Sequence, residues 1–275
     1  MRLLVKFGYL GWLYSGYQKG NGDRSVEDTI LKVLRSNDLS ESLQSAARTD
    51  RGVSAISNVI AVDTTERPSK VLGILNSSID GMIFHGYAVV PDDFNPRHND
   101  YKIYRYILPG NQAGPYLRNA LKPFRGKHDF RNFCRLDERN PVRTINSIRV
   151  KAASDMVYVD FKARSFLWNQ IRTIMAYAVE RSGNAEQTDP FERKERYGKM
   201  LEPESLVLLE MVYDGIEFKN ALSISKVKQF AEAQRRSNLR NRVMQSFSLV
   251  MGDNVVNNRG IVSMTSWVTG SRQDR

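Results

Sequence analysis

Short apolar or alternating segments recur along the chain and predict β-strands, because successive side chains of a strand point to opposite faces of a sheet. The first example is LLVKFGY at residues 3–9. Segments of this kind cover residues 3–9, 57–64, 82–90, 101–108, 145–150, 156–163 and 205–214. The link AASD joins 145–150 to 156–163, so we expect these two strands to form a hairpin.

Three other segments place apolar residues at helical spacing. In SVEDTILKVLRS (25–36), Ser25 is a typical N-cap residue, and Asp28 follows three residues later, as in a capping box. Residues 69–78 predict a second helix, and FLWNQIRTIMAYAVE (166–180) predicts a third. The buried stripe expected in the first helix consists of Val26, Ile30, Val33 and Leu34.

Helices and strands interleave throughout, which predicts an α+β protein with a large, mostly antiparallel sheet. We expect one half at residues 1–100, a second at 101–214 and a basic extension at 215–275. Within the extension, 223–242 is helical and basic, and both a solvated surface helix and an RNA contact fit it. For 243–275 we expect one or two strands and a polar tail.

Charge is the most informative bulk property. The chain has 275 residues and a formal net charge of +11, which points to a polyanionic partner, nucleic acid first. No apolar run approaches the roughly 18 residues that a spanning helix needs. The single cysteine, Cys134, excludes an intrachain disulfide and fits a reducing compartment, so we expect a soluble cytoplasmic protein without a membrane contact.

Metal and nucleotide cofactors are not expected. His85, His98 and His128 lie far apart in the sequence, and the glycine patterns of nucleotide-binding loops are absent from it. Cys134 could be a nucleophile, but a small buried hydrophobic residue is the better interpretation.

The stretch SAARTDRGVSA (45–55) places Asp50 between Arg48 and Arg51, with Gly52 next. The two cations would favour the carboxylate and lower its pKa. A carboxylate held in this way is a poor general base but can act as a nucleophile. From the residues alone, a loop ion pair remains the default interpretation of this stretch.

Two further features stand out beyond this loop. Tyr104 and Tyr106 share a strand face with Lys102, where they could stack a base or pack in the core. Arg172 lies among apolar residues on the third predicted helix. It could reach solvent along its apolar stem, or it could pair with Asp50 or a phosphate.

Taken together, these motifs resemble the TruA-type tRNA pseudouridine synthases. AARTDRGVSA resembles the family's GRTDxGVHA catalytic loop, and VPDDFNPRHNDYKIYRYIL is similar to its VPxxFHARFxAxxRxYxYxI stretch. VDFKARSFLWNQIRTIM resembles its VxIxAxxFLxxMVRxIV helix, and SLVLLEMVYD looks like its GLxLxxVxY strand. YLGWLYSGYQ, RSVEDTILKVL and KHDFRNF also match, so the resemblance covers about residues 1–214.

The resemblance implies two related, ferredoxin- or RRM-like halves that form one extended sheet flanked by helices, with a basic cleft between them. It implies that Asp50 is the catalytic carboxylate and that Arg172 pairs with it. Tyr104 would stack on the target base and assist proton removal at C5, and Arg48 would help flip the nucleotide. The substrate-binding residues implied by the match are Tyr104, Arg48, Arg97, Lys102 and Tyr106.

Family members use no cofactor or metal, and they usually act as homodimers on tRNA. Bacterial members modify neighbouring uridines of the anticodon stem-loop. Departures such as Leu10, Ser54, Trp168 and Asn169 suggest a divergent, archaeal branch and bear on the choice of uridine. The main alternative is a non-catalytic RNA-binding or RNA-folding protein on the same scaffold, and a hydrolase with paired acids is a third interpretation.

Overall fold

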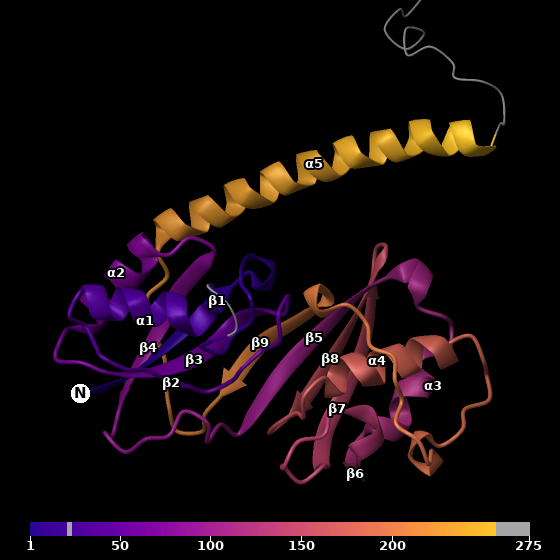
Figure 1. Ribbon diagram of the computed structural model, residues 1–275, viewed down its shortest axis with the longest axis horizontal. Coiled ribbons are helices and arrows are strands. Elements are labelled where there is room, and N and C mark those ends of the chain that lie inside the picture. The colour runs from indigo at the N-terminus through magenta and orange to yellow at the C-terminus, as the bar shows by residue number, and fades with distance from the viewer. Residues whose placement is uncertain (21–23, 257–275) are drawn as a thin grey trace, which may run out of the picture. The chain divides into compact units, whose positions relative to one another are not determined.

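The computed structural model describes residues 1–20 and 24–256, with side chains up to residue 245. The chain divides into two compact units, of which the first is Met1–Ser223 and the second begins at Ile224 (Figure 1). The strands are β1 (Arg2–Tyr9), β2 (Gln44–Ser45), β3 (Ser54–Asp63), β4 (Met82–Val90), β5 (Tyr101–Pro109), β6 (Gly126–Asp129), β7 (Val142–Ala153), β8 (Met156–Ala163), β9 (Leu206–Val212) and β10 (Lys219–Asn220). The helices are α1 (Val26–Ser36), α2 (Pro68–Ser78), α3 (Leu117–Leu121), α4 (Gln170–Arg181) and α5 (Ile224–Val256).

All the strands of the first unit belong to one sheet. Its order is β10-β4-β1-β3-β9-β5-β8-β7-β6, and β2 pairs with β3 beside this path. Every pairing is antiparallel except β3 with β9. The α+β class and the mostly antiparallel sheet are therefore confirmed. Figure 1 shows α1 and α2 beside the strands of the first half, and α3 and α4 beside those of the second.

Strand β9 joins the two halves of the sheet. Ser54 of β3 pairs with Val207 in parallel, and Leu208 pairs with Tyr104 of β5 in the antiparallel direction. The start of β3 and the loop before it are thereby held one strand away from β5. The boundary expected at residue 100 falls between β4 and β5, whereas the relatedness of the two halves stays a prediction.

Local sequence signals account for the helix ends. The Ser25 side chain accepts a hydrogen bond from the Asp28 N–H at 3.0 Å and donates to the Asp28 carboxylate at 2.7 Å, so the expected N-cap is confirmed. Helix α4 begins at Gln170 and not at Phe166, because Asn169 takes a left-handed conformation with φ of 63°. The Gln170 N–H donates to the Leu167 carbonyl at 3.2 Å, so a turn precedes the helix and becomes part of the site described below.

Helix α5 corrects the prediction for the end of the chain. It includes the basic helix expected at 223–242 but continues to Val256, where a strand was expected. Residues 257–275 lie outside the described part, and so does any strand or tail there.

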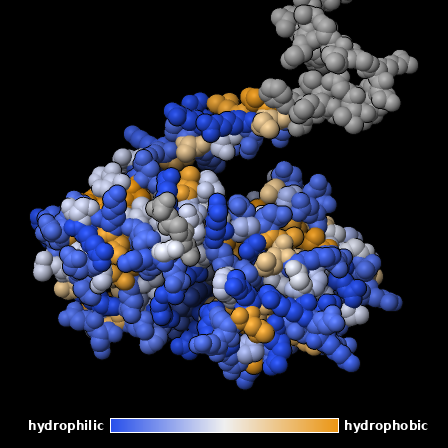
Figure 2. Space-filling view, viewed as in Figure 1, coloured by the Kyte–Doolittle hydropathy of each residue, from blue (hydrophilic) through white to orange (hydrophobic). Residues whose placement is uncertain are grey.

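The surface of the described part is mainly polar. Figure 2 shows a largely hydrophilic face on which apolar side chains form small patches. No helix in the described part is both long and apolar enough to span a membrane. The core of the first unit lies along the sheet, with Phe7, Phe84, Phe124, Phe133 and Phe161 fully buried.

Candidate active site

The loop that carries Asp50 is fixed from both sides by the first half of the sheet. The hydroxyls of Tyr9 on β1 and Thr49 lie 2.8 Å apart, and the Tyr17 N–H donates to the Thr49 carbonyl at 3.2 Å. The Asn58 amide on β3 donates to the Ala47 carbonyl at 3.0 Å. These contacts hold the backbone before Asp50, and the Val53 N–H donates to the Asp50 carbonyl at 3.2 Å, so the carboxylate has a defined position.

Gly52 is required by the shape of this loop. Its φ is +88°, a region that residues with a Cβ rarely adopt. A Cβ at this position would also lie 2.9 Å from both Glu204 Oε1 and Pro203 Cγ. The loop can therefore approach residues 203–204, just before β9, only because residue 52 is glycine.

The second half of the sheet supplies a cation to Asp50. Arg172 on α4 places Nη1 3.8 Å from Asp50 Oδ2, and both side chains are largely buried. Arg172 Nε donates to the Leu201 carbonyl at 2.8 Å, and Nη1 donates to Asn169 Oδ1 at 3.3 Å. The guanidinium is thus held by α4 and by the segment before β9, so it stays beside Asp50 as a fixed positive charge.

Burial raises the pKa of Asp50, and the expectation of a lowered pKa is wrong. Loss of hydration disfavours the carboxylate more than nearby groups favour it. The opposing influences are the charge of Arg172, a hydrogen bond from the Trp168 side chain and the charge of Arg135. The sequence neighbours Arg48 and Arg51 are exposed and do not contribute, because adjacent residues in a loop project in different directions.

Tyr104 lies at the same place on β5. Its ring packs edge-on against Phe166 with 5.4 Å between centroids, and only 8% of the residue is exposed. Burial, followed by the nearby Tyr9 and Asp50, raises the pKa of its phenol. Tyr104 is therefore a neutral phenol beside an acid at neutral pH.

Arg97 and Lys102 form a second cationic group next to the loop. Arg97 Nε lies 3.4 Å from the Ser45 carbonyl oxygen, and Lys102 Nζ lies 3.5 Å from that of Ala46. Burial, together with the charge of Arg97, lowers the pKa of Lys102 to about 8. Among the side chains that the structure describes, none forms an ion pair with Arg97 or Lys102, so these two neighbouring cations have no acidic partner there.

The remaining predicted residues have separate positions. Arg48 is exposed, and its Nη1 lies 3.4 Å from Gln18 Oε1. Tyr106 is 1% exposed and donates its hydroxyl to the Glu202 carbonyl at 2.9 Å, which ties β5 to the segment before β9. The structure thus brings Asp50, Tyr104 and Arg172 together, leaves Arg48 at the surface and places Tyr106 in the core.

Sequence reasoning missed three residues of the site. Tyr9 anchors Thr49, whereas Trp168 and Arg135 act directly on the pKa of Asp50. The only feature of the sequence that could have pointed to Trp168 is its departure from the family pattern. No signal pointed to Arg135, because its approach to Asp50 depends on tertiary packing.

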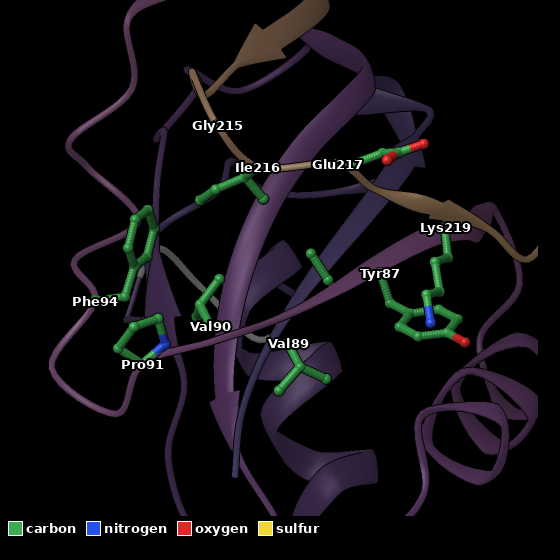
Figure 3. Close-up of a pocket in the computed structure, with 10 residues that line it drawn as sticks. Tyr87, Val89, Val90, Pro91, Phe94, Gly215, Ile216, Glu217 and Lys219 are labelled. Atoms are coloured by element: carbon green, nitrogen blue, oxygen red, sulfur yellow. The ribbon is translucent and has the colours of Figure 1, made fainter.

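Other candidate features lie away from this site. Cys134 is buried, in line with the interpretation as a small hydrophobic residue. In the described part of the chain, no three His, Cys, Asp or Glu side chains come together in a way that could hold a metal ion. A cavity of about 500 Å³ lies between β4 and residues 215–219, where Phe94, Ile216 and Lys219 border it (Figure 3), and no residue of the Asp50 loop lines it.

Comparison with known proteins gives a consistent result. Residues 120–214 match a family model described as tRNA pseudouridine synthase. The chain is 48% identical to tRNA pseudouridine synthase A of Thermoplasma acidophilum, covering 82% of this chain and 88% of that protein. It is 43% identical to the protein of that name from Picrophilus torridus, over 79% and 84% of the two chains. It is 32% identical to that of Pyrococcus furiosus, over 95% and 100%.

Proposed function

The chain belongs to the TruA-type tRNA pseudouridine synthases, and from this we propose that it isomerises uridine to pseudouridine in tRNA, with Asp50 as the catalytic carboxylate. The observation that carries the assignment of Asp50 is its fixed contact with Arg172, 3.8 Å away across the two halves of the sheet. A carboxylate in a buried loop would otherwise lose its charge to desolvation.

The reaction rearranges bonds without gain or loss of atoms. The bond between the ribose C1′ and N1 of the uracil breaks, the base turns, and C5 bonds to C1′. The proton on C5 is then removed, and N1 gains one. The ionised carboxylate of Asp50 supplies the negative oxygen that starts this sequence, so it must be deprotonated when substrate binds.

Tyr104 and Arg172 support this chemistry in different ways. Arg172 keeps Asp50 charged and fixed. Tyr104 supplies a ring for the uracil to stack on and a hydroxyl near C5. Since its pKa is raised, Tyr104 is a neutral phenol at neutral pH, so it can relay the proton from C5 only by giving up its own proton in the same step.

The cations near the loop fit a role on the RNA backbone. A uridine leaves its helical stack at a cost of roughly a few kcal/mol, and phosphate contacts offset that cost. Arg97 and Lys102 face each other without an acid, and a phosphate between them would relieve their mutual repulsion. Arg48, exposed at the rim, would contact the flipped nucleotide.

The finer assignments follow from the family and are part of the same proposal. The target uridines lie in the anticodon stem-loop, the tRNA lies in a basic cleft between the halves, and the enzyme is a cytoplasmic homodimer. Mapping carbodiimide-reactive positions on treated tRNA would identify the uridines. Sedimentation equilibrium would measure the oligomeric state.

The experiment that tests the function uses Asp50→Asn and tRNA labelled with tritium at C5 of uridine. We expect no tritium release above background, with tRNA affinity near that of the wild type, because the amide keeps the shape and removes the charge. Asp38→Asn is the matched control, since Asp38 is exposed and its φ of 54° suits asparagine. Normal release by Asp50→Asn would refute the catalytic role, and no release by the wild type would refute the function.

A further inference from the structure

Trp168 is a large aromatic side chain in an unusual place. It is 40% exposed, whereas Tyr104 and Tyr9, the aromatic residues near the loop of Asp50, are buried. Its side chain also reaches Asp50, where its hydrogen bond acts on the carboxylate. A large indole that stays 40% exposed beside Asp50 keeps ring surface available to a ligand.

Arg135 packs against the ring of Trp168. Its guanidinium carbon lies 3.9 Å from the centre of the Trp168 ring, which is a close cation–π contact. The Arg135 N–H donates to the Trp168 carbonyl at 2.8 Å, so the two residues are also joined through the backbone. Arg135 is exposed, and no ion pair of the described residues involves it.

The pair combines the two properties that single-stranded RNA sites share. An aromatic ring accepts a base of any sequence by stacking, and a guanidinium contacts the phosphate or stacks in turn. One side of the ring is covered by Arg135, and the exposed area of the indole remains for a ligand.

We propose that Trp168 and Arg135 form a stacking site for an unpaired nucleobase next to the uridine that Asp50 attacks. The site rests on the proposed function, because it needs an RNA strand that is opened at the target nucleotide. Once the uridine leaves the stack, its neighbour loses a partner, and the indole replaces it. Arg135 contacts the adjoining phosphate.

The contact with Asp50 links this site to catalysis. Both Trp168 and Arg135 lower the pKa of Asp50, against the larger effect of burial. Losing either group should therefore move the acid limb of the pH–rate profile to higher pH. A residue with only a structural role would lower the melting temperature without this shift.

The kinetic test compares Trp168→Ala, Trp168→Phe and Arg135→Gln. Stacking on an aromatic ring predicts that Trp168→Ala raises KM for tRNA by about tenfold or more. Trp168→Phe keeps a ring, so its KM should change less while its acid limb still moves up. Arg135→Gln should raise KM and move the acid limb, whereas Arg149→Gln, an exposed arginine on β7, should do neither.

A direct test uses the fluorescence of Trp168 alone. The chain has three tryptophans, so Trp12→Phe combined with Trp267→Phe leaves Trp168 as the only indole. Added tRNA should quench this fluorescence through base stacking. Wild-type KM in Trp168→Ala, together with unquenched Trp168 in a protein that forms pseudouridine, would overturn the stacking site and leave the function standing. Absence of product from the wild type would instead refute the function.

Discussion

Replacing Arg172 by glutamine tests how the site keeps an acid ionised in a buried loop. The substitution removes the positive charge 3.8 Å from Asp50 Oδ2 and leaves a shorter, neutral polar side chain. Nothing else in the loop changes, because Thr49 and Ala47 are held by other contacts. We expect the pKa of Asp50 to rise further, since desolvation is then less opposed.

The size of the effect follows from Coulomb's law. At 3.8 Å and an effective dielectric constant of about 20, the attraction is roughly 4 kcal/mol before screening. Asp50 keeps 31% of its side-chain exposure, so water screens part of that energy, and a net loss of about 1–3 kcal/mol is reasonable. Since one pKa unit is about 1.4 kcal/mol, the acid limb of kcat/KM should move up by roughly one to two pH units, and activity on that limb should fall by about tenfold to a hundredfold.

The assay is tritium release as a function of pH, with Arg172→Lys as the conservative comparison. The acid limb of kcat/KM should move to higher pH in Arg172→Gln, so that raising the pH restores part of the lost activity. Arg172→Lys keeps the charge, so its acid limb should lie nearer to that of the wild type. An unchanged acid limb would refute the reasoning, and a loss that is equal at every pH would make Arg172 a substrate contact.

Two further outcomes follow from the loop and its cations. Gly52→Ala should lower the free energy of unfolding by about 1–3 kcal/mol in urea melts, because of its positive φ and close contacts. Gly73→Ala is the control, because residue 73 lies inside α2 with open space around it. Alanine should stabilise the protein there by about 0.5–1 kcal/mol. If Gly73→Ala instead lowered the free energy of unfolding as much as Gly52→Ala, the effect at residue 52 would not be specific to its backbone. Lys102 is charged below its pKa of about 8, so tRNA affinity should weaken as the pH rises through that value, and Lys102→Gln should remove this pH dependence in fluorescence anisotropy. If tRNA affinity depended on pH in Lys102→Gln as it does in the wild type, Lys102 would be excluded as the titrating group.

Much of the fold could be predicted from local patterns. The N-cap at Ser25, the hairpin of β7 and β8 and the strand β5 all lie where periodicity and polar residues place them. The insertion of β9 between β3 and β5 could not be predicted, since pairing between strands far apart in sequence depends on the assembled core. The end of α5 was also missed, because its last turns are apolar enough to suit either a strand or a helix.

The site, like the fold, could be predicted from the sequence only in part. Motif resemblance singled out Asp50, Tyr104 and Arg172, and the structure places them together at the junction of the two halves. Reasoning from neighbours in the sequence failed for the pKa of Asp50, because the flanking arginines project into solvent. Charge effects depend on distance in space, so Arg172, more than a hundred positions away in the sequence, affects the pKa of Asp50 more than the adjacent Arg51 does.

The origin of that distant charge has a consequence for how the site is assembled. Asp50 belongs to a loop ordered by β1 and β3, whereas Arg172 is ordered by α4 and the segment before β9. Burial raises the pKa of Asp50, and the groups that oppose this effect, led by Arg172, all come from the second half. Strand β9 fixes the distance between the two groups, since it pairs with β3 on one side and with β5 on the other. A shift of β9 relative to β3 would therefore reduce activity through the charge on Asp50 even when Asp50, Tyr104 and Arg172 are all present.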